Sequence, residues 1–205
     1  MEEPEMTDTS HRTVVANISL TLDGRVNGPG GDYDQSWVVP HAVSQVALSH
    51  MNRVTGPATT ALLGRKNYEG FGGYWPTVAD DETAPAECRE FSRWLNEVDK
   101  VVFSTTLRKA AWQNSRIATG DPVTTVKELR GQRGGDIVVL ASTSVIKALL
   151  AADEVDRLSV TLCPELVGGG VQLFDETVTR GSWALVDPTP TDSGALCLLY
   201  DRKRD

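Results

Sequence analysis

Three short stretches of this sequence place small, hydroxyl or basic residues directly after apolar runs that are typical of β-strands. They are Gly64-Arg65-Lys66-Asn67, Ser104-Thr105-Thr106 and Ala141-Ser142-Thr143-Ser144. A turn from a strand into a helix leaves backbone N–H groups unpaired and carries partial positive charge, which suits phosphate. Each stretch alone is explained as well by a helix cap. Three in one chain, one with paired cations, predict an anionic ligand with several phosphates, such as a dinucleotide.

Other motifs that carry chemistry are missing or ambiguous. Neither Gly28-Pro29-Gly30-Gly31 nor Gly168-Gly169-Gly170 forms G-x-G-x-x-G after a strand, and no G-x-x-x-x-G-K-[ST] loop is present. The stretch Asn27–Asp34 is either a surface loop or a flap beside a site. No zinc motif occurs, and His41 and His50 are expected on one helix as surface or site-wall residues, so we predict no metal.

The composition of the chain restricts the classes of function that it can have. The chain has 205 residues, enough for one domain, and a net charge of −8 that gives no long-range attraction to nucleic acid or anionic membranes. No apolar run is long enough to span a bilayer. Three widely spaced cysteines favour reduced thiols and a cytoplasmic protein. The acidic, polar start predicts an N-terminal tail over residues 1–12, followed by a single domain over 13–205.

Apolar spacing predicts alternating strands and helices. Expected strands are Thr13–Leu20, Ala58–Leu63, Lys100–Phe103, Asp136–Leu140, Asp156–Leu162 and Ala195–Tyr200. Expected helices are His41–Val54, with Val43 on its buried face, Pro85–Val98, one that begins at Asp121-Pro122, and Val145–Ala152. This order predicts an α/β fold of three layers, α/β/α, with a mostly parallel central sheet and late strands at an antiparallel edge. Ligands bind such sheets beyond the carboxyl ends of the strands.

Five segments carry a family resemblance over nearly all of Val14 to Tyr200. They are NISLTLDGRV (17–26), LLGRKNYEGFGGYWP (62–76), KVVFSTTL (100–107), DIVVLASTSVIKALL (136–150) and VDRLSVTLCPELVGGGVQLF (155–174). Their order resembles the dihydrofolate-reductase-like superfamily. The nearer branch is named after the C-terminal reductase domain of the bifunctional riboflavin deaminase-reductase, the RibD C-terminal domain.

The resemblance implies an NADPH site and hydride transfer to a small-molecule substrate. Gly64, Arg65, Lys66 and Asn67 match the first phosphate-binding turn, and Ser104 and Thr105 match the turn that receives the adenosine 2′-phosphate. The turn against the pyrophosphate corresponds to Ala141, Ser142, Thr143, Ser144 and Val145. Asn17, Ser19 and the segment to Asp23 would line the nicotinamide and the substrate. By this position Asp23 is our candidate proton donor; the alternative is that Asp23 only shapes the turn with Gly24.

Two departures from the family pattern bear on the cofactor. The family often has Gly-Gly where this chain has Ala141-Ser142, and in dihydrofolate reductases that link is cis. A cis bond between residues other than proline costs about 3 kcal/mol, and side chains there crowd a close phosphate, so either this turn is trans or the cofactor sits differently. Thr105 stands where an arginine is common, which removes a bidentate phosphate partner. Arg65, Lys66 or Arg108 could compensate, and we expect NADPH in preference to NADH.

The substrate is less constrained. The helix expected at His41–Val54 has no Asp or Glu, which disfavours dihydrofolate, because dihydrofolate reductases grip the pteridine with an acid on that helix. A 5-amino-6-(5-phosphoribosylamino)uracil reductase-like activity would need cations for the substrate phosphate, for which Arg25, Arg53 and Arg180 are candidates. The alternatives are a non-catalytic dinucleotide-binding module and a fold that serves only assembly. The resemblance also implies a homodimer.

Overall fold

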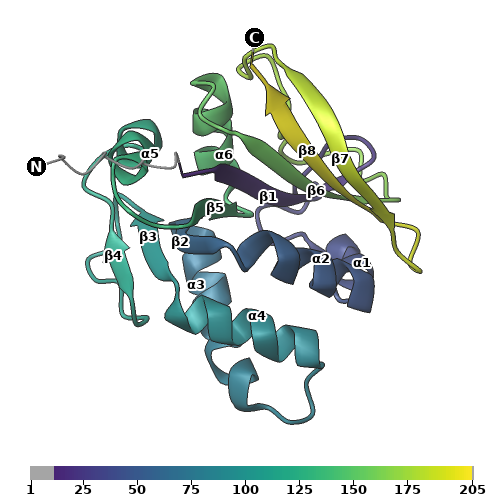
Figure 1. Cartoon of the computed structure of the whole chain (residues 1–205). Coiled ribbons are helices and arrows are strands. Elements are labelled where there is room, and N and C mark those ends of the chain that lie inside the picture. The colour runs from purple at the N-terminus through teal and green to yellow at the C-terminus, as the bar shows by residue number, and fades with distance from the viewer. Residues whose placement is uncertain (1–11, 205) are drawn as a thin grey trace, which may run out of the picture.

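The computed structural model describes residues 12–204, and its centre is one eight-stranded sheet in the order β4-β3-β2-β5-β1-β6-β8-β7 (Figure 1). The strands are β1 (Val14–Thr21), β2 (Ala58–Gly64), β3 (Asp99–Phe103), β4 (Ser115–Ile117), β5 (Asp136–Leu140), β6 (Arg157–Cys163), β7 (Ser182–Pro190) and β8 (Leu196–Lys203). The pairs from β4 through β6 are parallel, whereas β8 pairs antiparallel with both β6 and β7. The predicted mostly parallel sheet with an antiparallel edge is confirmed.

Helices cover both faces of the sheet and make the fold three-layered (Figure 1). The helices are α1 (Val39–Ala42), α2 (Gln45–Thr55), α3 (Arg65–Tyr74), α4 (Ala86–Glu97), α5 (Pro122–Arg130) and α6 (Thr143–Ala151), with short 3-10 turns at Ser36–Val38 and Trp75–Asp80. The side chain of Asp121 accepts hydrogen bonds from the backbone N–H groups of Val123 and Thr124, so α5 begins where the Asp-Pro signal predicts.

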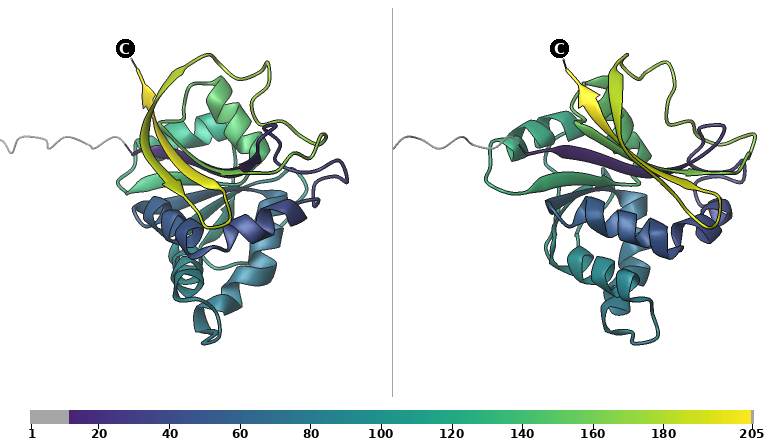
Figure 2. Two further views of the ribbon diagram at one scale, coloured as in Figure 1. Left: turned by 90° about the vertical axis from the view of Figure 1, so that its right-hand side faces the viewer. Right: turned by 45° about the vertical axis from the view of Figure 1, so that its right-hand side comes forward.

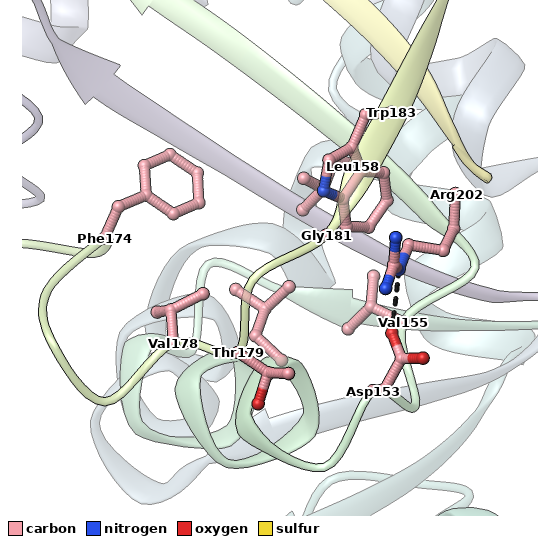
Figure 3. A pocket seen from close by; sticks show the side chains of 10 residues that line it. Asp153, Val155, Leu158, Phe174, Val178, Thr179, Gly181, Trp183 and Arg202 are labelled. Atoms are coloured by element: carbon pink, nitrogen blue, oxygen red, sulfur yellow. Dashed lines mark hydrogen bonds and ion pairs between the residues drawn. The ribbon is translucent and has the colours of Figure 1, made fainter. Parts of the chain in front are cut away.

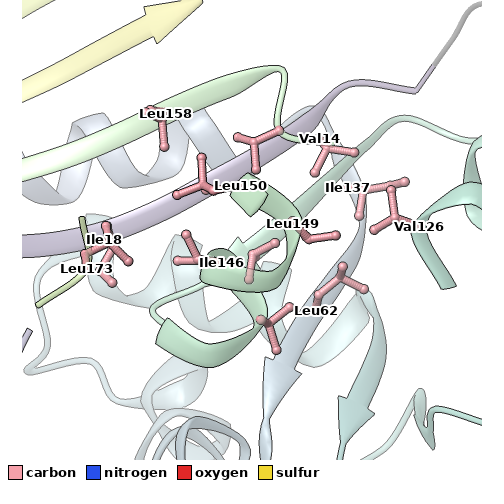
Figure 4. Packing of buried hydrophobic residues seen from close by; sticks show 14 of the residues in the cluster. Val14, Ile18, Leu62, Val126, Ile137, Ile146, Leu149, Leu150, Leu158 and Leu173 are labelled. Atoms are coloured by element: carbon pink, nitrogen blue, oxygen red, sulfur yellow. The ribbon is translucent and has the colours of Figure 1, made fainter. Parts of the chain in front are cut away.

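Two apolar clusters hold the layers together because successive residues of a strand face opposite sides of the sheet. One cluster joins Val14, Ile137 and Leu62 of the strands to Val126 of α5 and Leu149 of α6 (Figure 4). The other lies on the opposite face. It joins strand residues to α2, α3 and α4 and contains Val15, Leu63, Val138, Val54, Tyr68, Phe91 and Leu95. The central strands are therefore buried on both faces, as parallel strands usually are.

The prediction of one helix over His41–Val54 is wrong in one respect, because the structure has two helices there, α1 and α2. Ser44 has an extended backbone, with φ −63° and ψ 146°, and its side chain accepts a hydrogen bond from Ala47 N, so a new helix starts there. The break turns Val43 outward, where it is 58% exposed instead of buried. A serine cap outcompeted the apolar spacing that had favoured a continuous helix.

The strands β4 and β7 are not predicted by any apolar pattern in the sequence. β4 has only three residues, and β7 contains Pro188 and Pro190 and a register shift between Leu185 and Asp187. Proline removes a ladder donor and is tolerated at a sheet edge, which is where β7 lies. Figure 2 shows how the β7–β8 hairpin, in yellow, curves around the sheet. Its turn reaches α1, where His41 Nδ1 lies 3.0 Å from Ser193 Oγ.

The boundary of the domain also needs correction. Residue 12 was predicted in the tail, but Arg12 is 4% exposed, and its guanidinium donates to the carbonyl of Gly135 at 2.7 Å and to Thr60 Oγ1 at 2.7 Å. The folded domain therefore includes Arg12. The rest of the predicted tail, residues 1–11, lies outside the described residues.

The remaining sequence predictions concern thiols, metals and membranes. Cys88, Cys163 and Cys197 are all free and buried, and burial raises the pKa of Cys163 to about 12. Within residues 12–204 no cluster of three or more His, Cys, Asp or Glu side chains is arranged to hold a metal ion. Over the same residues no helix has the length and apolar character needed to cross a membrane.

Candidate nucleotide-binding groove

A groove of about 1090 Å³ opens where β2, β3 and β5 end. It brings together all of the residues predicted from the three turns. These are Gly64, Arg65, Lys66, Asn67, Ser104, Thr105, Ala141, Ser142, Thr143, Ser144 and Val145. Strands that neighbour one another in a parallel sheet end side by side, which is why turns far apart in the sequence share one groove.

The groove is lined by the N-terminal ends of two helices. Gly64 precedes α3 and Ser142 precedes α6, and in neither case does a side chain accept a hydrogen bond from the first turn of the helix. The N–H groups of those turns therefore keep their capacity to donate to a ligand. Together with the two helix dipoles, they favour a negatively charged group in the groove.

The groove contains three side-chain cations, and each has a carboxylate partner. Arg65 lies 3.3 Å from Glu69 on the next turn of α3. Lys66 pairs with Asp32, and Lys147 of α6 pairs with Asp175. Lys147 is not among the predicted site residues, because it lies one helical turn beyond the Ala141–Ser144 stretch and reaches the groove only through the folding of α6.

At the Ser104 end the groove is lined by hydroxyl groups. Ser104 Oγ accepts hydrogen bonds from the backbone N–H groups of Thr106 at 3.2 Å and Leu107 at 2.9 Å, which holds the turn closed. Thr105 is exposed and lines the groove without a charge of its own. Arg65 is a groove-lining cation, whereas Arg108, which was expected to compensate for Thr105, does not line the groove.

The stretch Asn27–Asp34, which the sequence left as a surface loop or a flap, lines the groove through Asn27, Asp32 and Tyr33. Asn27 is 4% exposed and ties this loop to the glycine loop: its Oδ1 accepts from Val171 N and its Nδ2 donates to Gly31 O, both at 2.8 Å. Two loops that are distant in sequence therefore form one wall. The interpretation as a flap beside a site is the one that the geometry favours.

Three predicted site residues lie outside the groove: Asn17, Ser19 and Asp23 do not line it. Asn17 points its amide to Ser159 Oγ at 2.9 Å and is 5% exposed. It supports the groove only through its carbonyl, which accepts from Ala141 N at 2.8 Å. The arginines proposed for a substrate phosphate, Arg25, Arg53 and Arg180, do not line the groove either.

Asp23 stabilises a turn. Its carboxylate accepts hydrogen bonds from Thr21 Oγ1 at 2.6 Å and from Gly168 N at 3.0 Å. These hydrogen bonds hold the pKa of Asp23 below its usual range. The largest effect comes from the Thr21 hydroxyl, and the backbone N–H groups of Gly168 and Val167 add to it. At neutral pH this carboxyl is ionised and has no proton to give. The geometry favours the structural role over the role of proton donor.

Ala141 adopts a left-handed backbone at the turn between β5 and α6. Its φ is +47°, and the peptide bonds of the described residues, including Ala141–Ser142, are all trans. This answers the question that the family's Gly-Gly had raised about the turn. A left-handed conformation at a residue with a Cβ is strained by about 1 kcal/mol.

We therefore expect Ala141→Gly to raise the free energy of unfolding by about 0.5–1 kcal/mol, because glycine adopts this conformation without strain. Urea denaturation of the two proteins measures the difference. Ala148→Gly, in the interior of α6 on the same groove, is the matched control and should lower the free energy of unfolding by about 1 kcal/mol. A loss of stability in Ala141→Gly would contradict the assigned strain.

Comparison with known proteins identifies the family of this chain. The model of the RibD C-terminal domain family matches residues 12–196. This chain belongs to the RibD C-terminal domain family. The predicted resemblance is confirmed, and the matched region begins at Arg12, the first residue that the structure describes.

This RibD C-terminal domain is similar to known proteins both in sequence and in structure. The uncharacterized protein YyaP of Bacillus subtilis (strain 168) is 25% identical over 190 residues, covering 92% of this chain and 94% of the relative. A crystal structure from Shewanella sp. PV-4, named for riboflavin biosynthesis, superposes with a TM-score of 0.67 at 20% identity, covering 94% and 99% of the two chains. Dihydrofolate reductase from Enterococcus faecalis, in complex with NADP(H), superposes with a TM-score of 0.58 at 17% identity, covering 94% and 97%. These likenesses show a dihydrofolate-reductase-like fold.

Below the sheet, the RibD C-terminal domain contains a buried polar chain around His50 of α2. His50 is 3% exposed and does not line the groove, so of the two predicted positions, at the surface or in the wall of a site, the surface is excluded. Its Nδ1 lies 3.0 Å from an Arg53 nitrogen, which can only donate, so Nδ1 accepts and the proton is on Nε2. Nε2 then donates to Ser159 Oγ at 2.9 Å. His50 is therefore neutral and links α2 to β6.

This arrangement predicts a pH dependence of stability. Burial first, and then the charge of Arg53, lower the pKa of His50 below its ordinary 6.5. Between the lowered pKa and 6.5 the unfolded chain binds more protons than the folded one, so the free energy of unfolding rises with pH and the gain is complete above pH 6.5. Denaturant titrations from about pH 5 to pH 7.5 should show this rise in the unaltered domain and a flatter profile in His50→Gln. An equal slope in both proteins would assign the rise to other groups.

A second cavity, of about 130 Å³, lies between the end of α6 and β7 (Figure 3). Its walls are partly apolar and include Leu158, Val178 and Trp183, and among its lining residues Arg202 Nε donates to Asp153 Oδ1 at 2.7 Å. It is too small for a nucleotide, and the one charged pair there is already satisfied. The groove at the strand ends remains the candidate site.

Proposed function

We propose that this protein is an NADPH-dependent reductase that transfers hydride to a small heterocyclic substrate. The observation that carries the proposal is a groove lined by two uncapped helix N-termini and three side-chain cations. Two turns that each favour a phosphate, with a hydroxyl-lined end at Ser104 and Thr105, suit the several phosphates of a dinucleotide. The family name and the NADP(H) bound to the superposable dihydrofolate reductase support the same cofactor.

For the substrate, we propose 5-amino-6-(5-phosphoribosylamino)uracil or a related heterocycle, since structures that superpose on this chain are named for riboflavin biosynthesis and for a reductase of that uracil. Dihydrofolate is disfavoured, because neither α1 nor α2 contains an Asp or Glu that could grip a pteridine. A homodimer and a cytoplasmic location are further proposals. Sedimentation velocity tests the first, and fractionation of the source cells tests the second.

The test is a titration with NADPH and with NADH, followed by quenching of the five tryptophans and energy transfer to the reduced nicotinamide. We expect micromolar binding of NADPH and weaker binding of NADH. Arg65→Ala should weaken NADPH binding by about 10-fold, the effect of one charge-assisted hydrogen bond. Arg133→Ala is the control, because this exposed arginine lies in the turn before β5, at the end of that strand away from the groove.

A second candidate function is a dinucleotide-binding module without catalysis. Asp23, the candidate acid from the sequence, is ionised and engaged in a turn, and α2 offers no carboxyl group in its place. Binding of NADPH with no consumption of it, across pyrimidine and pterin substrates, would favour this module. Binding of neither cofactor would overturn both candidates.

A further inference from the structure

Ser142 occupies the N-cap position of α6 but does not cap that helix. Serine at this position ordinarily accepts a hydrogen bond from the second or third N–H of its own helix. Here the side chain turns away: Oγ accepts from Gly64 N at 2.8 Å and donates to the carbonyl of Leu140 at 2.8 Å. The residue is 2% exposed, and its hydrogen bond to Leu140 is buried while the one from Gly64 is partly buried.

The partner of Ser142 is the N-cap residue of the other groove helix. Gly64 precedes α3, and the parallel ladder between β2 and β5 ends at the pair Leu62 and Val139. Beyond that pair the two strands separate, and β2 leads into α3 while β5 leads into α6. The Ser142 hydroxyl adds a connection after the backbone ladder has ended. It joins the starting points of the two helices directly.

The Ser142 turn is anchored on its other side as well. The N–H of Ala141 donates to the carbonyl of Asn17 in β1 at 2.8 Å. Three neighbouring strands, β2, β5 and β1, therefore hold this turn in place. Because Ser142 Oγ uses its proton for Leu140, it has no donor left for a phosphate. Its contribution to the groove is geometric.

We propose that Ser142 is a positioning residue that fixes the spacing of the two phosphate-facing turns, so that one dinucleotide contacts both. This inference rests on the proposed function. A ligand that spans the turn at Gly64 and the turn at Ala141 depends on their separation. A shorter ligand that occupies one turn does not. Loss of the hydroxyl should therefore weaken the two classes of ligand unequally.

The experiment compares Ser142→Ala and Ser142→Thr with the unaltered protein. The probes are NADPH, which is long enough to span both turns, and adenosine 2′,5′-bisphosphate, which is only its adenosine half. Ser92→Ala is the matched control, since Ser92 is fully buried at 0% exposure and donates to the Trp75 carbonyl at 2.6 Å, away from the groove. Hydrogen exchange of the Gly64 amide is measured in all four proteins.

For Ser142→Ala we expect NADPH to bind about 10-fold more weakly while the bisphosphate changes by less than about 2-fold. The Gly64 amide should exchange faster in that variant alone, and Ser142→Thr, which keeps a hydroxyl, should restore both values. Equal weakening of the two ligands, or the same pattern in Ser92→Ala, would overturn the positioning role and leave the reductase proposal standing. Failure of the unaltered protein to bind NADPH would overturn both.

Discussion

Replacing Gly170 with alanine is expected to lower both the stability of the fold and the affinity of the groove for a dinucleotide. Gly170 has φ +83°, and a Cβ there would lie 2.0 Å from the carbonyl oxygen of Asn27. The left-handed backbone alone costs about 1 kcal/mol with a side chain present. Backbone atoms cannot yield as a flexible side chain can, so the two loops must separate. We expect a total loss of at least about 2 kcal/mol in the free energy of unfolding.

The effect reaches the groove because the clash occurs at its wall. Asn27 and Val171 both line the groove, and they are joined by the hydrogen bond from Val171 N to Asn27 Oδ1. Moving Gly170 away from Asn27 pulls this wall apart, and NADPH binding should weaken by about 10-fold or more.

Gly168→Ala separates backbone strain from the clash. Gly168 has φ +70°, but nothing lies within 4 Å of the position of an added Cβ. This variant should lose only about 1 kcal/mol of stability and keep its affinity for NADPH. Urea denaturation and the tryptophan titration provide the two readouts. If Gly170→Ala loses no more stability and no more affinity for NADPH than Gly168→Ala, the folded protein does not need the close approach of the two loops.

Lys100→Met is expected to destabilise the domain strongly, although Lys100 lies far from the groove. Its ammonium group is buried, with the residue 1% exposed, and donates to the carbonyls of Leu95 at 2.6 Å and Val98 at 2.8 Å. These carbonyls belong to the C-terminal end of α4, where no helical N–H remains to pair with them. The group also lies 4.8 Å from the ring centroid of Trp112. Methionine keeps the volume and removes the donors, so we expect a loss of about 2–4 kcal/mol.

The cost of this substitution should depend on pH in a defined direction. Burial lowers the pKa of Lys100 from 10.5 to about 8. Between those values the unfolded chain binds more protons than the folded one, so the contribution of Lys100 to stability grows as pH rises. A neutral amine still has donors for both carbonyls. The difference in free energy of unfolding between the unaltered protein and Lys100→Met should therefore be larger at about pH 10 than at pH 7.

Lys109→Met is the control for Lys100→Met, because Lys109 is exposed to solvent. Its effect on stability should stay within about 0.5 kcal/mol at both pH values. A cost for Lys100→Met that shrinks as pH rises would mean that Lys100 is charged in the folded protein well above pH 8.

The sequence by itself determined most of the strands and helices and the place of the groove. Buried runs such as Asp136–Leu140 predicted strands because two covered faces demand continuous apolar residues, and the Asp-Pro pair predicted the start of α5. Once the sheet was taken as parallel, the turns at Gly64, Ser104 and Ala141 had to share its carboxyl edge. These inferences use only neighbours along the chain and one rule of topology.

Only the tertiary structure decided which side chains meet. Asp23 was predicted at the site, yet it caps the loop at Gly168, 145 residues away. Ser142 was predicted to face a phosphate, yet its hydroxyl holds Gly64. The counter-ion of Lys147 is Asp175, in a loop that no periodic pattern described. Such contacts depend on strand register and on how closely loops approach, because a shift of one residue turns a side chain to the opposite face of the sheet. The local sequence pattern therefore predicts where the groove lies, and long-range packing determines which side chains line it.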